Sequence, residues 1–174
     1  MKRSLFPLGI TVAALVAVGA ASQVFAQATT PTIEKAAIEA LEQRYSDAFN
    51  AKKVDAIMTC YTPGKALFVF DAVPPREYPS WDAYKRDWEG LLSAYPGPLS
   101  VTVSEQNITV VGSVAYGHNI QSGYFTRKDG TRMNWVVRVS DVYRKTKGQW
   151  LIVQEHVSFP VDLETGKADL LSKP

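Results

Sequence analysis

Ionisable side chains interrupt the last two apolar strand patterns of the sequence. Residues 136–160 read VVRVSDVYRKTKGQWLIVQEHVSFP, which predicts two β-strands joined by a short turn. A simple hairpin would keep its charges at the turn, but Asp141, Glu155 and His156 stand within the strands. An acidic side chain that faces inward loses hydration, so such a position needs a polar environment or a function. We therefore predict that this sheet encloses a pocket.

Alternation assigns the polar side chains of the last strand to one of two faces. If Trp150 and Ile152 face inward, His156 faces inward with them and is a candidate general acid or base. In the other register, Glu155 takes that role. Both faces of this strand are largely apolar, so periodicity leaves both registers open. Two apolar faces also suggest that a second copy of the chain covers the outer one, which predicts a homodimer.

The strand before it is predicted to form a wall of the pocket. Alternation places five side chains on one face: Met133, Trp135, Val137, Val139 and Asp141. Of these, Trp135, Val137 and Val139 are candidates for contact with a ligand. Arg138 and Arg144 fall on the opposite face, where an ion pair or a subunit contact is the simpler interpretation.

An earlier strand pattern, VAYGHNIQS, adds a further candidate. His118 is most simply a structural histidine, but we keep it as a ligand-binding candidate because imidazole titrates near neutral pH. Asn119 and Gln121 lie on the other face of that strand and could face the ligand instead. The sequence leaves this choice open.

Three helical patterns precede the strands. Apolar residues recur every three to four positions over residues 33–49, and Thr30–Pro31 predicts the start of this amphipathic helix. A short second helix is expected over residues 54–61, and Ser80 is the expected N-cap of a third. Aromatic side chains at helical spacing on the third helix fit a core and are also candidates for ligand contacts: Trp81, Tyr84 and Trp88.

The order of these elements predicts the fold class. One buried strand, ALFVFD, ends at Asp71 ahead of a proline-rich loop, and four longer strand patterns follow from Leu99 onward. Helices first and a strand meander afterwards are typical of an α+β domain, with the helices packed on one face of a curved antiparallel sheet. Such a sheet leaves a cavity beneath the helices.

The first 26 residues have the pattern of a secretory signal peptide. Lys2 and Arg3 precede an apolar run, and small residues end it at Ala26, the expected cleavage site. We therefore predict a periplasmic or secreted protein without a membrane segment after cleavage. The predicted domain covers residues 27–160, and residues 161–174 form a tail.

Composition argues against several classes of partner. Loss of Lys2 and Arg3 would leave 17 of the 19 basic side chains against 17 acidic ones, and this balance does not favour nucleic-acid binding. One cysteine, Cys60, and two histidines far apart give no metal-ligand spacing. Nucleotide and flavin motifs are absent from the sequence, so we expect no metal and no cofactor.

Residues 42–75, EQRYSDAFNAKKVDAIMTCYTPGKALFVFDAVPP, carry a resemblance to a known superfamily. Together with VSDVYRK and WLIV near the C-terminus, this stretch resembles the ketosteroid isomerase and SnoaL-like polyketide cyclase superfamily. The resemblance covers roughly residues 33–159. It implies the cone-shaped nuclear transport factor 2 fold, with three N-terminal helices on the concave face. The superfamily includes isomerases, cyclases, dehydratases, epoxide hydrolases and non-catalytic binding domains.

The resemblance also implies roles for three residues. Ketosteroid isomerase uses an aspartate base, with a tyrosine and a protonated aspartate as donors to the enolate oxygen. By motif similarity, Asp71 resembles the base, and Tyr45 and Asp141 resemble the donors. Each residue also has a purely structural interpretation. Tyr45 could be a buried tyrosine with an ordinary hydrogen-bond partner, Asp71 could form a turn, and Asp141 could pair with an arginine.

Two main functional hypotheses follow. The first is an exported domain that binds a small apolar ligand with a carbonyl group and catalyses a cofactor-independent proton transfer of the isomerase or cyclase type. The second is a binding or assembly module of the same fold without chemistry. A third hypothesis, a dehydratase or hydrolase, would use His118 or His156 with a carboxylate.

Overall fold

The computed structural model describes residues 17–172, and before residue 31 it describes the helix without its side chains. Residues from 34 onward form one compact unit, and the part of the first helix before residue 34 belongs to another. The first 16 residues of the predicted signal peptide lie outside the described part. Within residues 17–172, none of the helices combines the length and apolar character needed to cross a membrane.

Helices come first and strands follow, as the sequence predicts. The elements are α1 (Ala17–Asn50), α2 (Val54–Met58), the 3-10 turn η1 (Gly64–Ala66), β1 (Phe68–Phe70), α3 (Trp81–Ala94), β2 (Leu99–Val111), β3 (Val114–Thr126), β4 (Arg132–Thr146) and β5 (Gln149–Ser158). The predicted start of the first helix at Thr30–Pro31 is wrong, because Pro31 lies inside α1. The predicted cap of α3 is confirmed, since the Ser80 hydroxyl accepts a hydrogen bond from the Ala83 amide.

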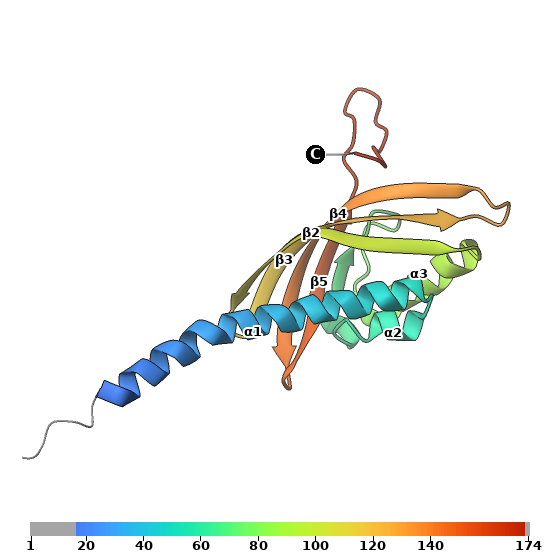
Figure 1. Ribbon diagram of the computed structural model, residues 1–174. Helices are drawn as coiled ribbons and strands as arrows, with labels where there is room; N and C mark the ends of the chain where they lie inside the picture. Colours follow the sequence, from blue (N-terminus) through green and yellow to red (C-terminus); the bar gives the residue numbers. More distant parts are fainter. Residues whose placement is uncertain (1–16, 173–174) are drawn as a thin grey trace, which may run out of the picture. The chain divides into compact units, whose positions relative to one another are not determined.

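The five strands form one curved sheet in the order β1-β5-β4-β3-β2 (Figure 1). Strands β2 to β5 pair antiparallel, which confirms the predicted meander. Strand β1 pairs parallel with β5, so the sheet is mixed rather than purely antiparallel. The chain between β1 and β5 includes α3 and three strands, and this length permits the parallel pairing. The α+β class is confirmed.

A β-bulge in β5 decides which of its side chains face inward. Val142 pairs with Gln154 but Tyr143 pairs with Ile152, so Val153 is an extra residue. An extra residue reverses the alternation along a strand. Trp150 and Ile152, which precede the bulge, and Glu155, which follows it, therefore all face the interior and are buried. The two apolar faces seen in the sequence are the result of this reversal.

Side-chain contacts hold residues 34–50 of α1 across the concave face of the sheet. Glu34 accepts hydrogen bonds from Lys145 at 2.6 Å and from the Trp150 indole at 2.6 Å. At the other end, the Asn50 amide exchanges hydrogen bonds with the Val101 backbone. Between these ends lie the buried side chains that α1 contributes to the core: Ile38, Leu41, Tyr45, Ala48 and Phe49. The position of Tyr45 over the sheet follows from this two-ended attachment.

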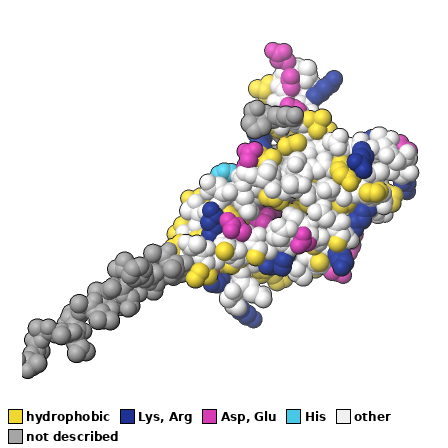
Figure 2. All heavy atoms as spheres, in the orientation of Figure 1, with side chains coloured by type: hydrophobic (Ala, Val, Ile, Leu, Met, Phe, Trp, Pro, Cys, Tyr) yellow, Lys and Arg dark blue, Asp and Glu magenta, His cyan; other side chains and the backbone are white. Residues whose placement is uncertain are grey.

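The segment after β5 folds back on the sheet. The Asp169 amide donates to the Pro160 carbonyl at 2.8 Å, and the Leu170 carbonyl accepts from the Val136 amide at 2.7 Å. Residues 161–171 thus form a loop that projects beyond the sheet and returns to it (Figure 1). Figure 2 shows acidic and basic side chains interspersed over the visible face, in agreement with the balanced composition.

Candidate functional site

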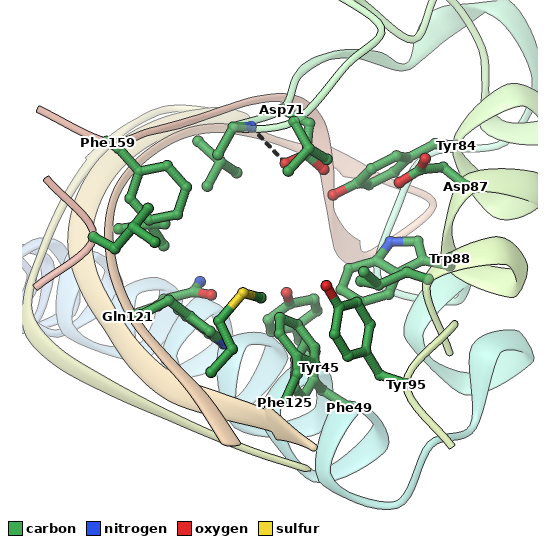
Figure 3. Close-up of a pocket in the computed structure, with 18 residues that line it drawn as sticks. Tyr45, Phe49, Asp71, Tyr84, Asp87, Trp88, Tyr95, Gln121, Phe125 and Phe159 are labelled. Carbon is green, nitrogen blue, oxygen red and sulfur yellow. Dashed lines mark hydrogen bonds between the residues drawn. The ribbon is translucent and has the colours of Figure 1, made fainter. Parts of the chain in front are cut away.

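A cavity of about 310 Å³ lies between the helices and the sheet. This volume is at the lower end of the range for small-molecule pockets. Its walls come from α1, the loop after β1, α3, three strands and the C-terminal segment (Figure 3). The lining side chains are Tyr45, Phe49, Asp71, Ala72, Val73, Tyr84, Asp87, Trp88, Leu91, Tyr95, Gln121, Phe125, Met133, Trp135, Val137, Val157, Phe159 and Leu170.

Aromatic rings form much of the wall. Phe125 and Trp135 stack with ring centroids 5.5 Å apart and an angle of 28° between their planes. Phe49 packs edge-on against Trp88 at 5.4 Å. Gly123, which pairs with Trp135, leaves room for the indole, because a Cβ there would lie 2.8 Å from the Trp135 ring and 2.0 Å from the Ser100 carbonyl. This part of the cavity suits an apolar, ring-shaped ligand.

Two carboxyl groups provide the charge of the cavity. Asp71, in the loop directly after β1, accepts a hydrogen bond from the Ala72 amide at 2.5 Å. Burial, together with the nearby charge of Asp87, raises the pKa of Asp71 to about 6. Asp87 accepts a hydrogen bond from the Tyr78 hydroxyl at 2.6 Å. A carboxyl with a pKa close to neutral is suited to accept a proton from a ligand.

Two tyrosines bring hydroxyl groups to the cavity. Figure 3 shows the Tyr45 hydroxyl directed into the hollow and the Tyr84 hydroxyl directed toward Asp71. Burial and the surrounding carboxylates raise the pKa of both phenols well above the usual value, so both keep their protons. Among the described residues, the Tyr45 hydroxyl has no hydrogen-bond partner, which leaves its proton available to a ligand.

Glu155 lies behind the cavity wall with both carboxyl oxygens engaged. The Tyr61 hydroxyl donates to one oxygen at 2.9 Å, and the Tyr84 hydroxyl donates to the other at 2.8 Å. Only 3% of Glu155 is exposed. Burial and the negative charge of Asp71 raise the pKa of Glu155 to about 8, although the two phenols act in the opposite direction.

A second pair of buried carboxyls shares one phenol. The Tyr143 hydroxyl lies 2.9 Å from a Glu42 oxygen and 3.2 Å from an Asp141 oxygen. One hydroxyl has one proton, so it cannot satisfy two ionised carboxylates. Burial raises the pKa of Glu42 to about 7 and that of Asp141 well above its usual value. The pair therefore holds at least one proton near neutral pH.

The structure brings Tyr45 and Asp71 to the same cavity but leaves Asp141 outside its lining. Asp141 faces inward as expected, but lies beside Glu42 and Tyr143 instead of pairing with an arginine. Of the predicted ligand contacts, Tyr84, Trp88, Trp135 and Val137 line the cavity. Trp81 and Val139 do not, since the Trp81 indole donates to the Met58 carbonyl and Val139 is buried in the core.

Both histidines lie on the outer face of the sheet. His156 is exposed because the bulge at Val153 turns Glu155 inward in its place. His118 is exposed because Asn119 and Gln121 occupy the inward positions of β3. Neither histidine lines the cavity, where the sequence analysis had placed them as candidates.

Several lining residues were not selected from the sequence. Asp87 lies three positions after Tyr84 on the same stripe of α3, so helical spacing could have identified it. Phe159 and Leu170 carried no such signal, because only the return of the C-terminal segment brings them to the cavity. Across residues 31–172, no group of three histidine, cysteine, aspartate or glutamate side chains is arranged to hold a metal ion.

Comparisons with known proteins agree with this architecture. The family model of the SnoaL-like domain matches residues 38–162. An NTF2-like protein of unknown function from Pseudomonas putida is 26% identical, with a TM-score of 0.74 over 82% of this chain and 98% of that one. No curated protein matches the sequence.

Two other structures, both from Novosphingobium aromaticivorans, share the fold at lower identity. One, provisionally assigned as a scytalone dehydratase, is 18% identical, with a TM-score of 0.66 over 82% of this chain and 96% of that one. The other, provisionally assigned as an aromatic ring hydroxylase, is 16% identical, with a TM-score of 0.67 over 79% and 99%.

Proposed function

The chain belongs to the SnoaL-like domain family, as its motifs predicted, and on that premise we propose that its cavity binds a small, mainly apolar ketone and that Asp71 removes a proton next to the carbonyl. The observation that carries this proposal is the combination, in one cavity, of aromatic walls with a carboxyl group whose pKa is near 6. Both features are needed, because the walls bind the ligand and the carboxyl performs the chemistry.

The charges of the lining limit the class of ligand. Asp71 and Asp87 are its only ionisable side chains apart from tyrosines, and it contains no basic group. An anionic ligand would be repelled by these carboxylates and would lose its hydration without compensation. A neutral ligand is therefore favoured over a carboxylic acid of the same shape.

The proposed reaction is a transfer of one proton. Asp71 takes a proton from the carbon beside the carbonyl, the C–H electron pair becomes part of a C=C bond, and the carbonyl oxygen becomes an enolate. The Tyr45 hydroxyl, which is unpartnered in the described part of the chain, donates a hydrogen bond to that oxygen. Return of the proton to a different carbon gives an isomer. Such a donor in a dry site lowers a barrier by roughly 3 kcal/mol.

The alternative is ligand binding without chemistry. The hydrogen bond from the Ala72 amide to Asp71 supports it, because this contact is typical of a turn-forming aspartate. The two functions differ in one observable, which is the exchange of protons on a bound ketone.

The test uses 1-indanone, a flat aromatic ketone, in D₂O. Binding is measured from the tryptophan fluorescence, because two of the four tryptophans, Trp88 and Trp135, line the cavity. Exchange of the protons next to the carbonyl is measured by ¹H NMR. We expect the wild type to accelerate exchange and Asp71→Asn to bind the ketone with exchange reduced at least 100-fold. Asp55→Asn, on the exposed start of α2, is the matched control and should retain both properties.

Two outcomes would decide against parts of this proposal. Binding without accelerated exchange in the wild type would favour the non-catalytic alternative. Absence of binding, even at millimolar ketone, would refute the ligand class. An indane carboxylic acid should bind more weakly than the ketone, and tighter binding of the acid would contradict the argument from charge.

We also propose export and a homodimer, which the N-terminal sequence and the apolar strand patterns supported. The bulge in β5 weakens the argument for the dimer, because it accounts for the two apolar faces within one chain. The mass of the mature protein from the cell envelope would test cleavage after Ala26. A monomeric mass in solution would refute the dimer.

A further inference from the structure

The Tyr84 hydroxyl lies at the boundary between the cavity and a buried carboxyl group. It lines the cavity and points toward Asp71 (Figure 3). It also lies 2.8 Å from a Glu155 oxygen, and the Tyr61 hydroxyl lies 2.9 Å from the other oxygen. Neither Glu155 nor Tyr61 lines the cavity. Tyr84 thus connects the cavity to a carboxyl group that a ligand does not touch.

The number of protons in this group determines what Tyr84 offers to the cavity. A phenol has one proton and also accepts hydrogen bonds. When Glu155 is ionised, both phenols donate to it, and Tyr84 presents only its oxygen lone pairs to the cavity. When Glu155 is protonated, its own proton occupies one of the two contacts, and the phenol on that side is free to donate elsewhere. On the Tyr84 side, the freed proton can reach Asp71 or a ligand oxygen.

We propose that Glu155 is a positioning residue whose protonation decides whether the Tyr84 hydroxyl donates a hydrogen bond into the cavity. This inference rests on the proposed function for the presence of a ketone in the cavity, but the contacts among Glu155, Tyr61 and Tyr84 do not depend on it. It adds a second donor, beside Tyr45, whose availability changes with pH.

The surroundings of Glu155 place its titration in an accessible range. The acidic groups near it are Glu42 on α1, Asp71 after β1 and Asp141 on β4, and the phenols are Tyr45, Tyr61 and Tyr84. No basic group is among the causes that shift its pKa. Because burial dominates, the pKa of Glu155 is raised to about 8, well separated from that of Asp71 at about 6.

A change in ketone affinity follows from this titration. Below pH 8 Glu155 is protonated, and when its proton lies on the oxygen that faces Tyr84, the Tyr84 proton is available and the carbonyl oxygen gains a donor. Above pH 8 Glu155 is ionised and accepts the hydrogen bond from the Tyr84 hydroxyl. The carbonyl oxygen then faces only the lone pairs of the Tyr84 oxygen. One neutral hydrogen bond corresponds to roughly a fivefold change in affinity, so we expect the Kd for 1-indanone to rise about fivefold between pH 7 and pH 9.

The decisive variant is Glu155→Gln, which keeps the size of the side chain but cannot titrate. Its Kd for 1-indanone should be independent of pH between 7 and 9. Tyr84→Phe should also remove the pH dependence and should bind as weakly as the wild type at pH 9. Glu42→Gln is the matched control, because it removes a buried carboxyl that is hydrogen-bonded to Tyr143 and does not line the cavity. It should retain the pH dependence, with the midpoint at lower pH, because the charge of Glu42 contributes to the raised pKa of Glu155.

A second measurement does not require a ligand. The ¹³Cζ resonance of Tyr84, assigned from Tyr84→Phe, reports whether the phenol donates or accepts. In the wild type it should move with one transition near pH 8, and in Glu155→Gln it should not move over this range. A flat wild-type resonance, or a transition that persists in Glu155→Gln, would overturn the role of Glu155. If the resonance titrates as expected but indanone does not bind, the proposed function fails and the role of Glu155 stands.

Discussion

The space between the helices and the sheet has two contrasting halves. One is the hollow, the cavity walled by Phe49, Phe125, Trp135 and their neighbours. The other is the carboxyl–tyrosine cluster, which consists of Glu42, Asp141 and Glu155 with Tyr61, Tyr84 and Tyr143. The same strands supply both, since β4 contributes Trp135 to the hollow and Asp141 to the cluster. Tyr84 belongs to both halves.

The comparison teaches that inward polarity does not by itself mark a binding site. In the hollow, aromatic side chains pack edge-on or stacked around an empty space. In the cluster, hydrogen-bonded carboxyls and phenols fill the corresponding volume. Burial raises the pKa of Glu42 and Asp141, so these carboxyls retain protons and less charge is buried. The hollow can therefore accept a ligand, whereas the cluster can hold protons and pass their effect to the cavity through Tyr84.

The largest effect is expected from removing a wall of the hollow. Trp135→Ala deletes a 7% exposed indole that stacks on Phe125, and we expect a loss of about 3–5 kcal/mol in the free energy of unfolding, measured by urea denaturation. Trp81→Ala is the comparison, because Trp81 packs against the core but does not line the cavity. It should destabilise the protein while leaving indanone affinity within twofold, and Trp135→Ala should weaken binding at least tenfold. Equal effects of both variants on binding would contradict the assignment of the hollow.

The second effect tests the cluster through the pH dependence of stability. A carboxyl whose pKa is higher in the folded than in the unfolded chain binds more protons when folded. Its stabilising contribution is complete below the unfolded value near 4.5 and is lost as pH rises through the folded value, about 7 for Glu42 and about 8 for Glu155. We therefore expect Tm to fall by roughly 5–10 °C between pH 5 and pH 8.5.

Variants of the cluster should reduce this slope. Glu42→Gln and Glu155→Gln each replace a titrating group with a neutral one of the same size, so the fall in Tm should become smaller in either variant and smaller still in the double variant. Thermal unfolding followed by circular dichroism measures the slope. A Tm that rises with pH over this range would show that the carboxyls of the cluster are ionised in the folded protein, and would contradict the conclusion that they retain protons.

The smallest effect is expected outside both halves. His118→Ala and His156→Ala change exposed side chains on the outer face of the sheet. We expect His118→Ala to alter the free energy of unfolding by less than about 0.5 kcal/mol, and His156→Ala by up to about 1 kcal/mol, because the His156 ring packs edge-on against Phe70. Indanone affinity and proton exchange should match the wild type. Loss of exchange in either variant would restore the hypothesis of histidine-dependent hydrolase or dehydratase chemistry.

The sequence by itself determined the elements and most of the inward faces. Helical spacing on α3 identified Tyr84 and Trp88, and alternation on β4 identified Trp135, Val137 and Asp141 as inward residues. These predictions succeeded because side-chain direction within one helix or one regular strand depends only on its own period. The motifs around Tyr45 and Asp71 likewise indicated two residues that share a cavity.

Two choices were decided only by the tertiary structure. The first is whether Glu155 or His156 faces inward, and the second is whether Asp141 lines the cavity or lies behind its wall. The first choice depends on the bulge at Val153, which is defined only by the pairing of β5 with β4. The second depends on Glu42 and Tyr143, which are 101 positions apart in the sequence and meet only when α1 crosses the sheet. Periodicity is local information, whereas these outcomes depend on contacts between elements that are distant in the chain.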